Sequence, residues 1–79
     1  MSDNLPKTYK QLDALLTSAL DAEKHQIHGR DVDFIREFIE NGEYGVAYQH
    51  LIGALFEDRL KASEKSEIAL NAAADLMNL

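Results

Sequence analysis

Apolar residues recur at intervals of three and four along most of the chain, and this periodicity constrains the fold more than any other feature. In an α-helix this spacing places side chains on one face, which must be buried against another element. No segment shows sustained alternation with the β-branched and aromatic residues typical of strands. The sequence therefore predicts an all-α fold, a compact bundle of four helices that forms a single helical domain over residues 1–79.

Turn and capping residues divide the first half of this pattern into two helices. The first helix is expected at about residues 6–24, and a loop with a turn at Gly29 is expected at residues 25–30. Asp31 is expected to cap a second helix at about residues 32–41, because its side chain can accept a hydrogen bond from a free N–H group of the first turn. The expected core positions in these two helices are Tyr9, Leu12, Leu15, Leu16, Ala19, Leu20, Val32, Ile35, Phe38 and Ile39.

The second half of the chain is expected to form two further helices. Gly42 ends the second helix, and a third, centrally placed helix is expected at about residues 43–59. Gly45 and Gly53 each weaken a helix by about 1 kcal/mol relative to alanine, so we expect a neighbouring helix to approach closely at both. Ser63 is the expected N-cap of the fourth helix. The expected core positions here are Tyr44, Ala47, Tyr48, Leu51, Ala54, Leu55, Ala69, Ala72, Ala73 and Leu76, while Ile52 and Phe56 leave the other side of the third helix apolar.

Composition limits the environment and the partners of the protein. The chain has no cysteine, which excludes a disulfide framework and suits the reducing cytoplasm, where we expect the protein to reside. No apolar run approaches the roughly 18 residues that span a bilayer, so no membrane association is expected. Fourteen acidic side chains against eight Lys and Arg give a formal charge of −6. This charge disfavours direct binding to nucleic acid and favours a cationic protein partner.

The sequence lacks the residue patterns of an active site. His25 and His28 have a spacing that can begin a metal site, but a catalytic zinc usually needs three protein ligands. No serine lies in a nucleophile elbow, and the glycines are too scattered for a phosphate-binding loop. We therefore expect no catalytic residues, no metal and no cofactor, and a binding protein, not an enzyme. An enzyme remains open only if the three histidines converge on a metal.

The candidate partner-binding residues lie on the second helix and at the start of the third. Asp33, Glu37 and Glu40 fall on one helix face, opposite the apolar stripe. Such an acidic ridge is either a solvated face or an interface for a cationic partner. Tyr44 and Tyr48 belong either to the core edge or to an interface, where tyrosine is a common anchor. The full candidate set is Asp31, Asp33, Glu37, Glu40, Glu43, Tyr44 and Tyr48.

Residues 38–51 contain a pattern of Phe, Ile, Glu, any residue, Gly, Glu, an aromatic residue, Ala after two further residues, and Leu. This pattern resembles the core of MafI-type immunity proteins, small antidotes encoded beside the polymorphic toxins of bacteria. The matching positions are Phe38, Ile39, Glu40, Gly42, Glu43, Tyr44, Ala47 and Leu51. The resemblance implies that the protein neutralises the toxin domain of its own system. Such a toxin is commonly a nuclease delivered between neighbouring bacteria by contact-dependent or secretion machinery.

Two functions therefore stay open on the sequence. The first is an immunity protein that forms a stoichiometric complex with a cationic, nuclease-like toxin domain, the chain itself being a monomer or weak homodimer. The second is a non-catalytic helical adaptor or homodimerisation module. Ile52 and Phe56 motivate the second function, because their face stays in contact with water unless another helix or subunit covers it.

Overall fold

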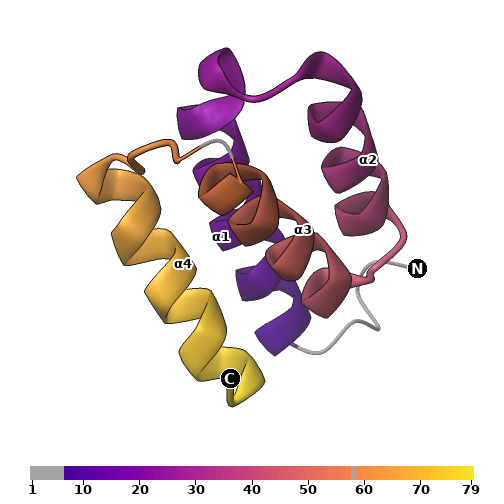
Figure 1. Ribbon diagram of the computed structural model, residues 1–79. Helices are drawn as coiled ribbons and strands as arrows, with labels where there is room; N and C mark the ends of the chain where they lie inside the picture. Colours follow the sequence, from indigo (N-terminus) through magenta and orange to yellow (C-terminus); the bar gives the residue numbers. More distant parts are fainter. Residues whose placement is uncertain (1–6, 58) are drawn as a thin grey trace.

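The computed structural model describes residues 7–57 and 59–79, which form four α-helices and no strand (Figure 1). The helices are α1 (Lys7–Glu23), α2 (Gly29–Glu40), α3 (Tyr44–Glu57) and α4 (Glu64–Met77), and a single 3₁₀ turn, η2 (Lys24–Gln26), follows α1. This architecture confirms the predicted all-α bundle of four helices. Residue 6, where the first helix was expected to begin, lies outside the described residues.

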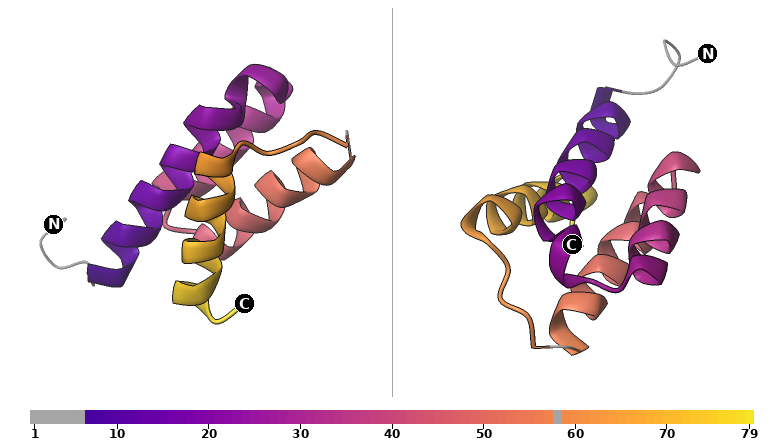
Figure 2. Two further views of the ribbon diagram at one scale, coloured as in Figure 1. Left: turned by 90° about the vertical axis from the view of Figure 1, so that its left-hand side faces the viewer. Right: turned by 90° about the horizontal axis from the view of Figure 1, so that it is seen from above.

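Consecutive helices run in alternating directions, with α1 and α3 between α2 and α4 (Figure 1). The central position predicted for the third helix is thus shared with α1. The most extensive packing joins α1 to α4 and α2 to α3, whereas α3 and α4 contact each other much less. The two views in Figure 2 show the long connection that carries the chain from the end of α3 back to the start of α4. The limited contact between α3 and α4 leaves part of their facing surfaces uncovered.

The core is built from the apolar faces of all four helices, as the periodicity predicts. Leu16, Leu20, Ile35 and Leu51 are its largest fully buried apolar side chains. The other buried apolar residues are Leu12, Ala19, Ile27, Ile39, Tyr44, Ala47, Ala54, Leu55, Ala69, Leu70 and Ala73. Ile27 follows η2 and was not expected in the core, because it belongs to a segment with no helical period of its own.

Two of the predicted core residues are exposed. Tyr9, in the opening turns of α1, is 46% exposed and packs its ring against that of Tyr44 at the surface. Leu76, in the last turn of α4, is also exposed, because the buried stripe of this helix is rotated towards Leu70. The four residues that form this stripe are Ser66, Ala69, Leu70 and Ala73. In an alanine-rich helix, several registers bury similar apolar area, so the periodicity fixes the stripe only loosely.

Three helices end in the same way, with a residue in the left-handed conformation that returns backbone N–H groups to the last turn. Gly42 has φ 76° and ends α2 as predicted, and Asn78 has φ 60° after α4. Arg59, with φ 54°, does this for α3, and the N–H of Leu60 donates to the carbonyl of Leu55 at 2.8 Å. The third helix therefore ends earlier than predicted, because no glycine marks this turn in the sequence.

The helix starts agree with the sequence at one position and disagree at another. Ser63 caps α4 as predicted, since its hydroxyl accepts a hydrogen bond from the N–H of Ser66 at 3.2 Å. The prediction that Asp31 caps the second helix is wrong: α2 begins at Gly29, and His28 occupies the cap position without a side-chain hydrogen bond. Gly29 is consequently the first helical residue and not a turn.

The expectation of close helix approach at two glycines of α3 is also wrong. A Cβ atom added at Gly45 or Gly53 would meet no atom within 4 Å. The neighbouring helices pack on α3 elsewhere, so neither glycine is needed to make room for them.

Alanine should therefore have opposite effects at Gly53 and Gly42. We expect Gly53→Ala to raise the free energy of unfolding by about 0.5–1 kcal/mol, because alanine favours the helix and meets open space. Gly42→Ala is expected to lower it by about 1 kcal/mol, because φ 76° is strained for a residue with a Cβ. Urea denaturation of the two variants measures both effects, and a shift of the same sign in both would contradict this account.

Candidate partner interface

An acidic ridge runs along the outer face of α2. Asp33, Glu37 and Glu40 are all exposed, and within residues 7–57 and 59–79 none of them forms an ion pair. The opposite face of the helix carries Ile35 and Ile39, which are buried. Packing of that apolar face thus turns the three carboxylates outward, where they can contact water or a partner.

The basic side chain nearest to the ridge along the chain is engaged elsewhere. Arg36 lies between Asp33 and Glu37 in the sequence, but its guanidinium forms an ion pair with Asp21 of α1 at 3.4 Å. Both side chains of this pair remain partly exposed, so the pair adds little to stability. The pair turns the guanidinium of Arg36 towards α1, so this positive charge does not neutralise the acidic ridge.

Asp31, one of the predicted partner-binding residues, faces α3. It is half-buried, and its carboxylate lies 3.8 Å from the imidazole of His50. The ring of His50 in turn packs against Phe34 and Phe38, with centroids 6.2 and 5.7 Å away. Asp31 therefore lies at the contact between α2 and α3, and its side chain is less exposed to a partner than those of the acidic ridge.

Phe34 is an exposed aromatic residue that was not among the predicted partner-binding residues. It is 45% exposed and follows Asp33 directly in α2. The sequence did contain a sign of this position, since Phe34 lies outside the stripe formed by Ile35 and Ile39. The structure thus places an exposed aromatic ring beside the acidic ridge.

The two candidate tyrosines lie in different places. Tyr44 is only 8% exposed, and its hydroxyl donates to the Asp13 carboxylate at 3.4 Å, which joins α3 to α1. Burial raises the pKa of Tyr44, and the negative charge of Asp13 adds to this effect. Tyr44 is therefore chiefly a core residue. Tyr48 is half-buried and lines a groove between α3 and α4, away from the ridge.

Glu43 lies between the acidic ridge and α3 and is exposed. Its N–H donates to the carbonyl of Phe38 at 2.8 Å, and its own carbonyl accepts from the N–H of Ala47 at 2.9 Å. Its backbone therefore closes one helix and opens the next, while its side chain stays at the surface. The seven predicted residues consequently do not share one surface: only Asp33, Glu37, Glu40 and Glu43 expose carboxylates along α2 and its C-terminal turn.

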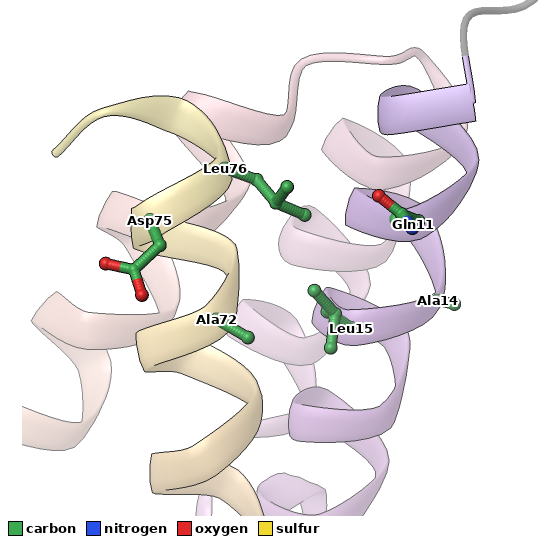
Figure 3. A pocket seen from close by; sticks show the side chains of 6 residues that line it. All are labelled: Gln11, Ala14, Leu15, Ala72, Asp75 and Leu76. Atoms are coloured by element: carbon green, nitrogen blue, oxygen red, sulfur yellow. The ribbon is translucent and has the colours of Figure 1, made fainter.

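Two apolar depressions lie on the other side of the molecule from the ridge. The first lies between α1 and α4 and is lined by Gln11, Ala14, Leu15, Ala72, Asp75 and Leu76. Figure 3 shows Ala72 and Leu76 extending from α4 towards α1, whereas Asp75 points away from the depression. The second is the groove between α3 and α4, which is lined mainly by Tyr48, Ile52, Leu55, Phe56, Leu60 and Leu70, with Lys61 and Glu67 at its polar positions.

Glu23 is the buried carboxylate among residues 7–57 and 59–79, and its hydrogen bonds join the end of α1 to the start of α4. Glu23, at the end of α1, is 1% exposed and accepts hydrogen bonds from the Ser63 N–H at 3.0 Å, the Ser66 hydroxyl at 2.7 Å and the Gln26 side chain. Burial alone would raise the pKa of Glu23, but these hydrogen bonds outweigh it and lower the pKa. Glu23 was not among the predicted core residues, although it continues the stripe of Leu16 and Leu20.

Within residues 7–57 and 59–79, no group of three or more His, Cys, Asp or Glu side chains is placed to hold a metal ion. His25 and His28 are both exposed. In the same part of the chain, no helix is both long and apolar enough to cross a membrane.

Comparison with known proteins found no matching family model, no matching curated protein and no matching solved structure. Function is therefore inferred from the surface of α2 and from the pattern at residues 38–51.

Proposed function

We propose that this chain is an immunity protein that binds the toxin domain of its own system and neutralises it by forming a stoichiometric complex. The observation that carries the proposal is the acidic ridge, in which Asp33, Glu37 and Glu40 are exposed and form no ion pair within the described residues. A nuclease toxin needs a cationic surface to hold the phosphate backbone of its substrate. An anionic helix face complements that surface and accelerates the encounter.

The exposed ring of Phe34 adds an apolar anchor to this surface. Interfaces usually combine a desolvated aromatic residue at the centre with a polar rim, and most of the binding energy comes from a few such anchors. Phe34 lies beside the acidic ridge, on the side of α2 nearer to His50 of α3, so an arginine of the toxin can stack on the ring and pair with a neighbouring carboxylate. Charge and apolar contact are thus available on the same helix.

The pattern shared with MafI-type immunity proteins corresponds to a defined corner of the fold. Residues 38–51 contain the end of α2, the left-handed turn at Gly42 and most of α3. Ala47 and Leu51 of the pattern are fully buried. The pattern therefore describes how α2 is joined to α3, and it supports family membership through the scaffold that presents the ridge.

Co-expression with the toxin tests the proposed function. The toxin domain encoded beside this chain should arrest growth when produced alone, and growth should recover when the chain is co-produced. The purified proteins should elute as one complex with equal numbers of the two chains. A non-cognate toxin domain serves as the control and should remain active. Continued growth arrest with both proteins present and soluble would contradict the proposal.

A further inference from the structure

The groove between α3 and α4 carries both a cavity and a projecting side chain on one face. Apolar side chains line the floor of the groove, including Leu55 and Leu70, which are buried. Phe56 stands at its edge and is 82% exposed, the highest value among the large apolar residues of the described chain. An aromatic ring in water beside an open apolar groove is unfavourable unless a second surface covers both.

We propose that this face binds a second copy of the same chain in a symmetric dimer, with Phe56 of each copy entering the groove of the other. A two-fold contact uses the same patch on both subunits, so the patch must be complementary to itself. A projecting ring beside a groove meets this condition, because a two-fold rotation places each ring over the groove of the other copy.

The charges at the groove favour a second copy over a cationic partner. Lys61 and Glu67 both line the groove, so its polar positions carry opposite charges. A two-fold axis that passes between these two side chains would bring Lys61 of each copy opposite Glu67 of the partner subunit, so that two such pairs form. The acidic ridge of α2 has no such balance and would repel a second copy. Two copies therefore repel each other less when they meet through the groove than when they meet through the acidic ridge.

A weak dimer requires only a small share of the surface of the chain. Weak complexes bury less than about 1,200 Å² in total, or about 600 Å² per copy. That is roughly a ninth of the 5329 Å² surface of the chain. Contact at this face leaves α2 uncovered, because no residue of α2 lines the groove. The dimer is thus independent of the proposed function, and either can fail without the other.

Sedimentation equilibrium of the purified chain tests the proposal. The weight-average mass should rise from 8.9 kDa towards twice that value between about 10 µM and 1 mM. Phe56→Ser should weaken self-association at least tenfold, and it should not unfold the protein because the ring is exposed. Phe34→Ser, which removes an exposed ring from α2, is the matched control and should leave the association unchanged.

Charge exchange tests the symmetric pairing. Lys61→Glu and Glu67→Lys should each weaken the dimer at least threefold, and the double variant should regain most of the loss because both pairs form again with reversed charges. A mass that stays at 8.9 kDa up to about 1 mM would overturn the proposal and leave the groove to a different partner. Equal weakening by Phe56→Ser and Phe34→Ser would overturn it as well.

Discussion

Replacing Glu23 with alanine is expected to lower the free energy of unfolding by about 2–4 kcal/mol, since buried polar groups that lose their partner cost about 1–3 kcal/mol each. The carboxylate accepts hydrogen bonds from the Ser63 N–H and the Ser66 hydroxyl, so it fastens the start of α4 to the end of α1. Urea denaturation followed by circular dichroism measures the loss. Glu57→Ala, which removes an exposed carboxylate from the end of α3, is the control and should leave stability unchanged.

The same residue should make stability depend on pH in a known direction. The pKa of Glu23 in the folded protein lies below its ordinary value of 4.5. Its contribution is therefore complete above the pKa of the unfolded chain and is lost as the pH falls through the folded pKa. Between about pH 5 and 2, the wild-type protein should lose more stability than Glu23→Gln, which has no proton to bind there. Parallel curves for the two proteins would contradict the assignment.

The features of the fold that could be predicted from the sequence are those set by interactions between residues close together in the chain. Leu12, Leu16 and Leu20 recur on one face of α1, and all three are buried. Gly42 was expected to end a helix because glycine adopts positive φ without strain, and Ser63 was expected to start one because its hydroxyl accepts a backbone N–H. Each of these expectations depends only on residues close together in the chain, and each is confirmed.

The parts that could not be predicted depend on contacts between distant residues. Arg59 adopts the left-handed conformation usually given to glycine, and nothing in its own side chain indicates this. Ile27 is buried although it lies between two helices, because the bundle closes over it. Glu23 lies on the apolar stripe of α1 and is stabilised there by serines about forty positions later in the chain, at separations of 40 and 43 residues.

The candidate interface also has a part that could be predicted from the sequence and a part that could not. The outward direction of Asp33, Glu37 and Glu40 followed from helical spacing, because these residues lie opposite a buried stripe. The contact of Asp31 with His50 and the hydrogen bond of Tyr44 with Asp13 both join different helices, so they depend on how those helices pack. Spacing within one helix predicts which way a side chain points, but the neighbouring helix decides whether that side chain is free for a partner.

Neutralising the acidic ridge should slow association with the toxin domain more than any other surface change of equal charge. The triple variant Asp33→Asn, Glu37→Gln and Glu40→Gln keeps the shape of the side chains and changes the formal charge from −6 to −3. We expect its association rate constant to fall by about 10- to 100-fold at low salt, because the attraction that steers the encounter is lost. A side chain that pairs directly with a toxin Lys or Arg should also raise the dissociation rate constant.

Stopped-flow binding or surface plasmon resonance measures both rate constants. The matched control is Glu57→Gln, Glu64→Gln and Asp75→Asn, three exposed carboxylates outside α2 whose loss gives the same net charge. Since steering depends on where charge lies and not only on its total, the control should slow association by less than about threefold. Equal slowing in both variants would show that net charge alone attracts the toxin. Unchanged rate constants in the ridge variant would place the interface on another face of the molecule.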